Sequence, residues 1–238
     1  SEWCAVWPCM FLPPGAGISS KNNIPGSDAA RAIVPVDRSA DEKFWENNDK
    51  VNFVRKSFEK CLAAASKAKE QGELGVGVLV TTLPSDADRA FFEFEVTAYD
   101  TRTSTNHPLR HAIPNAVRLV ADLRAQQHYD SHTSTTNGQD YLLTGLSLFI
   151  THEPCVYCAM ALVHSRVKRV FFLYPSPGTG GFCGVCNDDQ PFCHGMQDGG
   201  PFAIHEQSGL NHKYEVWRWI EPADLDDGGI SSSLPYDL

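Results

Sequence analysis

The chain has 238 residues, a formal net charge of −9 and an apolar content of 42%. This length and apolar content fit a single α/β domain with elaborated ends. The negative charge argues against a protein that binds nucleic acid unaided, because affinity for phosphates depends on Lys and Arg contacts. No apolar run approaches the roughly 20 residues of a membrane-spanning helix, and segment 3–14 lacks the basic leader of a signal peptide. We therefore expect a soluble intracellular protein, in the nucleus or the cytoplasm.

The eight cysteines indicate metal ligation in a reducing compartment rather than a disulfide framework. The reason is that a chain of this length carries a Cys-x-x-Cys pair directly after a proline. Most of the other thiols are expected to be free. The chain begins at Ser1 without an initiator methionine, as a piece of a longer protein would.

Composition divides the chain into three parts. Residues 1–41 are rich in Pro, Gly, Ser and Asn and read as an N-terminal extension and linker, with a lead strand around 5–8. Residues 42–221 form the expected domain, with a Gly- and Cys-rich insertion at 175–210. Residues 222–238 are an acidic tail, and its Gly and Ser residues predict flexibility.

Hydrophobic periodicity predicts three helices. The first, at 41–71, is closed by Gly72, and a second helix at about 114–126 carries a proline in its first turn, where it is tolerated. A third follows at 155–165. The apolar stripe of the first helix comprises Phe44, Val51, Val54, Phe58, Leu62 and Ala65.

Alternating or continuous apolar runs predict a five-stranded mixed sheet in the domain. Two early strands are expected to pair as a hairpin that turns around 84–89. A buried central strand, the third helix and the next strand imply a right-handed parallel crossover. The strands are expected at 76–80, 92–98, 143–150, 169–174 and around 214–217.

A zinc site is the chemistry that the sequence indicates most clearly. Cys155 and Cys158 lie at the start of a helix and face the same side, and a helix N-terminus lowers the pKa of a thiol. His111 lies at the start of the preceding helix, so two helices packed side by side on the sheet would complete the ligand set. The alternative is a pair of inert buried cysteines.

The residue two places after His111 restricts the chemistry that this site can perform. A zinc deaminase needs three protein ligands, an open fourth position and a carboxylate that moves protons, found two places after the histidine. Isoleucine occupies that place, as Ile113. Glu153 ends a buried strand and is expected to be structural, and Pro114 is expected to delay the start of the second helix.

Three segments resemble a known family: His-Pro-Leu-Arg-His-Ala at 107–112, the run from Thr-His-Glu-Pro-Cys to His-Ser-Arg at 151–166, and Gly-Leu-Asn-His-Lys-Tyr-Glu-Val at 209–216. The chain resembles the cytidine-deaminase-like superfamily over about residues 42–220. Within it, the chain resembles the non-catalytic subunits of eukaryotic tRNA-specific adenosine deaminases.

The resemblance implies a three-layer α/β/α fold and a zinc ion on His111, Cys155 and Cys158, with Ile113 at the catalytic glutamate position. It also implies a heterodimer with a catalytic deaminase subunit, which converts the wobble adenosine of tRNA to inosine while this chain helps to position the anticodon stem-loop. Two alternatives stay open. One is an autonomous nucleoside or nucleotide deaminase with an unrecognised proton carrier, and the other is a purely structural zinc module.

Two further groups of residues could bind the metal or a second one. The C-terminal carboxylate of Leu238 could reach the fourth position of the zinc, although a disordered acidic tail is the favoured alternative. A second cluster could hold another zinc, but free thiols are preferred there. This cluster comprises Cys183, Cys186, Cys193 and His194.

The remaining candidates have ordinary structural interpretations beside functional ones. Cations that follow the third helix are favoured by its dipole, and RNA contact is the alternative. His164 and His212 are expected to be hydrogen-bonded rather than to bind metal. Apolar residues of the third helix are either core or part of a subunit interface. The cations are Arg166, Lys168, Arg169, Lys213 and Arg218, and the apolar residues are Ala159, Met160 and Val163.

Overall fold

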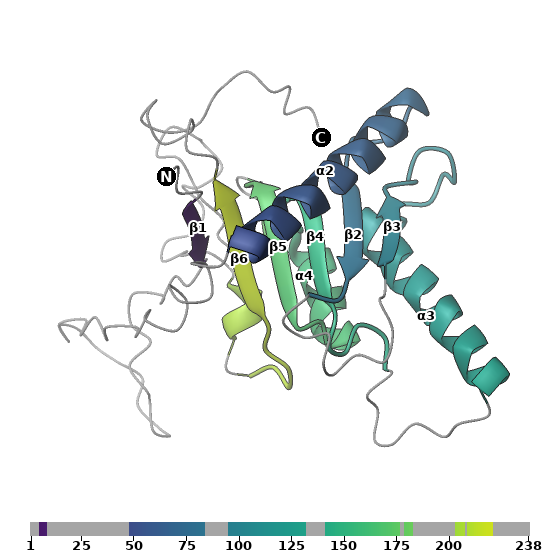
Figure 1. Cartoon of the computed structure of the whole chain (residues 1–238). Helices are drawn as coiled ribbons and strands as arrows, with labels where there is room; N and C mark the ends of the chain where they lie inside the picture. Colours follow the sequence, from purple (N-terminus) through teal and green to yellow (C-terminus); the bar gives the residue numbers. More distant parts are fainter. Residues whose placement is uncertain are drawn as a thin grey trace, which may run out of the picture.

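A mixed sheet of six strands forms the centre of the computed structural model of the chain (Figure 1). Its strand order is β1-β6-β5-β4-β2-β3. The structure describes residues 5–8, 48–83, 95–131, 141–176, 179–182, 203–207 and 209–220.

Three neighbouring strands of the sheet are parallel. They are β4 (Ser147–His152), β5 (Arg169–Tyr174) and β6 (Glu215–Ile220). Helix α4 (Val156–Ser165) joins β4 to β5, which confirms the predicted parallel crossover connection. The first five residues of β4 are buried, as expected for a strand covered on both faces.

The other strands are antiparallel to their neighbours. β2 (Gly77–Thr81) pairs with β4 on one side and with β3 (Glu95–Tyr99) on the other, so the predicted pairing of these two early strands is confirmed. At the opposite edge, β1 (Ala5–Pro8) pairs with β6. The sheet thus contains the five expected strands of the domain and the predicted lead strand as a sixth.

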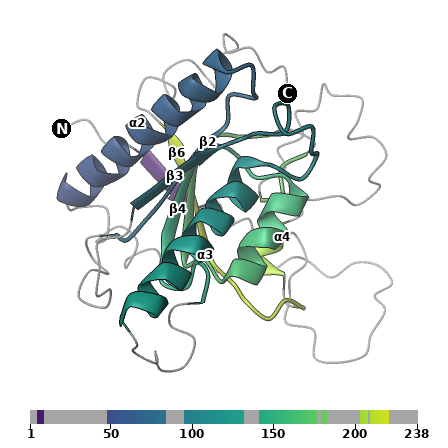
Figure 2. The same cartoon turned by 90° about the vertical axis from the view of Figure 1, so that its right-hand side faces the viewer.

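Helices cover both faces of the sheet, which confirms the three-layer arrangement (Figures 1 and 2). α2 (Asn48–Glu70) lies on one face, and α3 (Ala112–Ser131) lies beside α4 on the other. Because successive strand residues point to opposite faces, Leu79 packs toward α2 whereas its neighbour Val80 packs toward α3. A short 3-10 helix, η3 (Ile204–Glu206), lies against α4.

The buried stripe of α2 differs from the predicted one at a single described position. Val54, Phe58 and Ala65 are buried as expected, but Leu62 is 40% exposed and Cys61 occupies the inward position instead. The buried positions 54, 58, 61 and 65 are spaced by four, three and four residues, which follows the 3.6-residue helical period more closely than the predicted spacing of four, four and three.

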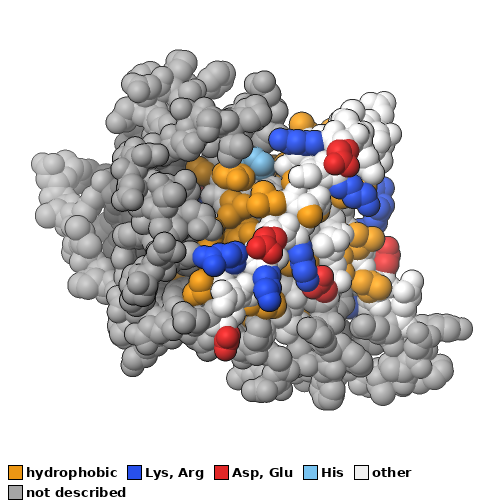
Figure 3. Space-filling view, turned by 45° about the horizontal axis from the view of Figure 1, so that its top comes forward, with side chains coloured by type: hydrophobic (Ala, Val, Ile, Leu, Met, Phe, Trp, Pro, Cys, Tyr) orange, Lys and Arg blue, Asp and Glu red, His pale blue; other side chains and the backbone are white. Residues whose placement is uncertain are grey.

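On the face shown in Figure 3, basic and acidic side chains are interspersed around exposed hydrophobic ones.

Two element boundaries were predicted wrongly. β4 begins at Ser147 rather than at residue 143, because Leu142 and Gly145 have φ angles of 41° and 78° that an extended strand cannot contain. α3 begins at Ala112, before Pro114, and runs through Ser131 into the predicted polar loop. Pro114 does not delay the helix because the first N–H groups of a helix have no partner within it.

Several predictions fall on residues outside those described. They concern Phe44, the turn around 84–89, the cluster of Cys183, Cys186, Cys193 and His194, and the tail that ends at Leu238. Among the described helices, none has both the length and the apolar character that crossing a membrane requires.

Candidate metal centre

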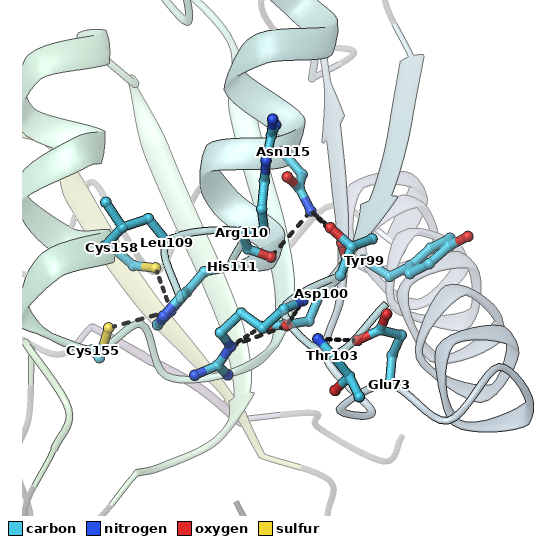
Figure 4. A network of polar contacts seen from close by, with 12 residues as sticks. Glu73, Tyr99, Asp100, Thr103, Leu109, Arg110, His111, Asn115, Cys155 and Cys158 are labelled. Atoms are coloured by element: carbon cyan, nitrogen blue, oxygen red, sulfur yellow. Dashed lines mark hydrogen bonds and ion pairs between the residues drawn. The ribbon is translucent and has the colours of Figure 1, made fainter. Parts of the chain in front are cut away.

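His111, Cys155 and Cys158 come together where the N-termini of α3 and α4 meet (Figures 2 and 4). His111 directly precedes α3, Cys155 is the N-cap of α4, and Cys158 lies in the first turn of that helix. The ligand atoms of these side chains all lie within 4.8 Å of one another. The predicted convergence of two helix starts on one face of the sheet is therefore what the fold provides.

The spacing of the three donor atoms fits a tetrahedral metal ion. His111 Nδ1 lies 3.7 Å from Cys155 Sγ and 3.4 Å from Cys158 Sγ. A tetrahedral zinc ion with ordinary Zn–S and Zn–N bond lengths separates sulfur from nitrogen by about 3.6 Å. Two thiol sulfurs and one imidazole nitrogen are also donors that zinc prefers. These residues can therefore hold zinc without moving far.

The pKa values of the two cysteine thiols are shifted in opposite directions. Hydrogen bonding with Cys158 lowers the pKa of Cys155 to about 4, with help from His111, although burial acts in the opposite direction. The same hydrogen bond, together with burial, raises the pKa of Cys158. Cys155 is therefore the thiol that loses its proton more readily, and a cation at this position would favour loss of the proton from Cys158 as well.

Ile113 points into the core of the domain. Its side chain is 0% exposed and belongs to the cluster between α3, α4 and the sheet, together with Ala116 and Val120. Among the described residues, the cluster of His111, Cys155 and Cys158 includes no carboxylate.

Glu153 has a structural role, as the sequence analysis expected. Its carboxylate oxygens accept hydrogen bonds from the N–H groups of Ser176, at 3.0 Å, and Phe182, at 2.9 Å. The backbone at Gly180 lies so close that an added Cβ would be 2.4 Å from the Glu153 carboxyl carbon. This buried side chain therefore fixes the segment that follows β5.

A network of polar contacts holds the loop that delivers His111 (Figure 4). The amide nitrogen of Asn115 donates to Tyr99 O and Thr101 Oγ1, both at 2.9 Å, and to Arg110 O at 3.2 Å. Asn115 thereby connects the end of β3 to the residue that precedes His111. Asn115 lies four residues after His111, a spacing that could have pointed to it in the sequence.

Two carboxylates anchor the other end of the same loop. Glu73, from the turn after α2, accepts hydrogen bonds from the N–H groups of Thr103 and Ser104 at 2.9 and 2.7 Å. Asp100 is 1% exposed and binds the Arg102 guanidinium with both oxygens. Both were missed because neither belongs to a recognisable motif.

A family model described as the cytidine and deoxycytidylate deaminase zinc-binding region matches residues 52–174, slightly more than half of the chain. This chain belongs to that deaminase family. The matched region includes all three residues of the candidate metal centre, and the resemblance noted in the sequence is confirmed.

Relatives of this deaminase-family chain are named after tRNA-specific adenosine deaminases. The "probable inactive tRNA-specific adenosine deaminase-like protein 3" of Mus musculus is 33% identical over 68% of this chain and 46% of its own length. The "tRNA-specific adenosine deaminase subunit tad3" of Schizosaccharomyces pombe is 27% identical over 71% of this chain and 46% of its own length. A solved structure from work on A-to-I editing by tRNA:A34 deaminases covers 69% of this chain and 97% of its own, with 18% identity and a TM-score of 0.45. The chain spans about half the length of the curated relatives it matches.

Other predicted site residues of this deaminase-family chain have structural partners. His212 Nε2 lies 2.7 Å from Val167 O, which confirms a hydrogen-bonded histidine. Arg169 forms an ion pair with Glu215 across β5 and β6 at 2.7 Å. Of the three α4 residues named as core or interface candidates, Ala159 and Val163 are buried within the chain and Met160 is partly exposed.

Exposed apolar side chains surround the candidate metal centre. Leu109 is 51% exposed, and Val156 and Tyr157 are exposed at the start of α4. The ring of Tyr157 contacts that of His111 edge to face at 5.5 Å. Leu119 and Leu123 of α3 are exposed as well.

Proposed function

We propose that this chain is the catalytically silent, zinc-holding subunit of a heterodimer that deaminates the wobble adenosine of tRNA to inosine. The observation that carries this proposal is Ile113, a buried hydrocarbon at the place where zinc deaminases have their proton-carrying glutamate. The names of the relatives from mouse and fission yeast, one called inactive and the other a subunit, support it.

In this proposal His111, Cys155 and Cys158 hold the zinc ion. The distances between their donor atoms support that assignment. In catalytic deaminases, bound zinc activates a water molecule that attacks the base. In this chain, an ion held by the three residues would connect the loop before α3 to the first turn of α4, which is a structural role for the metal.

Proton transfer is the step that this chain lacks. The attacking water must lose a proton and the leaving amine must gain one, and a carboxylate normally does both. Ile113 can do neither, and Glu153 is engaged with the N–H groups of Ser176 and Phe182. The glutamate is therefore supplied by a partner that carries its own complete site.

The exposed apolar residues near the metal centre are the surface where we place this partner. Leu109, Val156 and Tyr157 are exposed near the site, and Leu119 and Leu123 are exposed on α3. Exposed apolar groups concentrated on one side of a domain are typical of protein interfaces. Docking there would bring the two deaminase domains together at their zinc-bearing helices.

Mixing the chain with candidate catalytic subunits and measuring inosine in tRNA tests this function. We expect no inosine from this chain alone, and formation of inosine when the right partner is added. Leu123→Asp should prevent assembly, whereas Leu62→Asp should not, because both leucines are 40% exposed but α2 lies on the other face of the sheet.

Two results would support the rival functions instead. Deamination by the chain alone, lost in Cys155→Ala, would indicate an autonomous deaminase with another proton carrier. If the chain raised the solubility of the partner but not its affinity for tRNA, a purely structural zinc module would be the better interpretation.

A further inference from the structure

A groove of about 650 Å³ lies at the C-terminal end of α4. It is separated from the cysteine and histidine cluster by the length of that helix, about 15 Å. We propose that this groove binds one nucleotide unit of single-stranded RNA, with the phosphate between Arg166 and Lys213 and the base against the ring of His212. The choice of RNA as ligand rests on the proposed function.

Cationic side chains from three places in the chain converge on the groove. Arg166 ends α4, Lys168 precedes β5 and Lys213 precedes β6, and all three line the cavity. Two carboxylates line it as well: Glu215 forms an ion pair with Arg169, and Glu206 lies within the electrostatic influence of Lys213, so the three cations outnumber the one carboxylate that has no ion pair with Arg169. The groove is therefore locally cationic in a chain with a net charge of −9, as phosphate binding requires.

Arg166 occupies a backbone position that normally favours glycine. It is the C-cap of α4 with φ 57° and ψ 41°, in the left-handed region, and its N–H bonds to the carbonyls of Leu162 and Val163. Glycine adopts this conformation without strain, whereas other residues do not. The helix dipole favours a cation at this end, but it does not account for a residue other than glycine at a left-handed position, so the exposed side chain of Arg166 is the feature to be explained.

The groove also offers a fixed aromatic ring and a buried hydroxyl. The hydrogen bond of His212 Nε2 to Val167 O and the stacking of the His212 ring on Tyr214, at 6.2 Å and 27°, fix the imidazole plane. Bases of single-stranded RNA stack on such rings. Thr144 lines the groove, and among the described residues its buried Oγ1 has no hydrogen-bond partner, although buried hydroxyls are normally paired.

Binding of a fluorescently labelled single-stranded RNA of about six nucleotides, a length within the range that one small domain covers, tests the proposal. Fluorescence anisotropy of the full 238-residue chain without any partner measures the affinity. Lys213→Gln should weaken binding and lower the slope of log affinity against log salt by about 1. The matched control, Lys56→Gln on the exposed face of α2, should change neither quantity.

Arg166→Gly separates binding from folding. Glycine fits the left-handed C-cap better than arginine, so the melting temperature should stay the same or rise while RNA affinity falls. Affinity equal to that of the unsubstituted chain would overturn the proposal, as would loss of affinity in the Lys56→Gln control.

Competition identifies the ligand class. Adenosine monophosphate should displace the RNA at lower concentration than inorganic phosphate does, because it offers a base as well as a phosphate. Equal displacement by inorganic phosphate, or by a polyglutamate peptide, would indicate a simple anion patch or an acidic-peptide site and would refute nucleotide binding. These measurements need no deaminase partner, so their failure leaves the inosine assay as an independent test of the proposed function.

Discussion

At the scale of single residues, Ile113 decides what the metal centre can do. The side chain is 0% exposed and packs in the core cluster with Ala116 and Val120, so its position is specified by packing as well as by chemistry. A glutamate restored there would have to bury a charge or hold a proton.

Ile113→Glu should therefore destabilise the zinc-free protein by about 3 kcal/mol or more, because a buried carboxyl lacks partners in this apolar environment. The conservative substitution Ile113→Val should lower the free energy of unfolding by only about 1 kcal/mol. Urea denaturation of both variants gives the comparison. If the free energy of unfolding were the same for both variants, the side chain at position 113 would be able to turn from the core toward the metal ligands.

At the scale of elements, the end of β4 carries a histidine whose neutral form the fold favours. Burial, and secondarily the charge of Lys69, lowers the pKa of His152 from 6.5 to about 4. Gly77 N–H donates to Thr151 Oγ1, which leaves the hydroxyl proton free to donate to His152 Nδ1 3.0 Å away. An uncharged imidazole is the form that can accept this bond.

Stability should fall as the pH decreases from about 6.5 to 4. In this window the unfolded chain binds a proton at His152 that the folded chain does not, so acid favours unfolding. The contribution is up to about 3 kcal/mol for a shift of this size. Urea denaturation with a chelator present should show the difference between the wild type and His152→Asn shrinking by that amount between pH 7 and 4.

The loop between β3 and α3 is a second element that affects the metal centre, because it positions His111. Asn115 ties Tyr99 O, Thr101 Oγ1 and Arg110 O together, and the last of these directly precedes His111. Asn115→Ala leaves these buried acceptors without one of their donors, which costs about 1 to 3 kcal/mol. We expect this loss of stability together with weaker zinc binding, because the position of His111 is no longer fixed.

Competition with a chromogenic zinc chelator measures that affinity. The control is Asn211→Ala, an exposed asparagine in the loop before β6, which should change neither stability nor zinc binding. A variant at Asn115 that lost stability but bound zinc as tightly as the unsubstituted chain would show that the metal alone positions His111.

At the scale of the whole molecule, most of the architecture could be predicted from local patterns, and the exceptions have local causes. The bounds of β5 match the predicted 169–174, because its apolar run is framed by the polar end of α4 and by Pro175. The start of β4 was misplaced because Leu143 and Leu146 are buried in a turn, and burial alone does not distinguish turn from strand. His111, Cys155 and Cys158 could be proposed as metal ligands from motif spacing, and Asn115 could have been found from its place four residues after His111. Glu73 binds the backbone N–H groups of Thr103 and Ser104, which leaves no pattern in the sequence.

The metal centre joins two helices that are otherwise held by packing, so zinc should stabilise the whole domain. A ligand that binds only the folded state at a thousand times its Kd adds about 4 kcal/mol, which corresponds to about 10 °C in melting temperature for a chain of this size. Chelation should remove this increment from the unsubstituted protein. Cys155→Ser should lack it from the start.

Cys61→Ala is the matched control for that substitution. Cys61 is also buried, its thiol donates to Phe149 O at 3.3 Å and burial raises its pKa, but it lies under α2 on the other face of the sheet. The variant should melt at a lower temperature and still gain the full increment from zinc. If the increment persisted in Cys155→Ser, the stabilising zinc would be bound elsewhere, and the cluster of Cys183, Cys186 and Cys193 would be the next set of ligands to substitute.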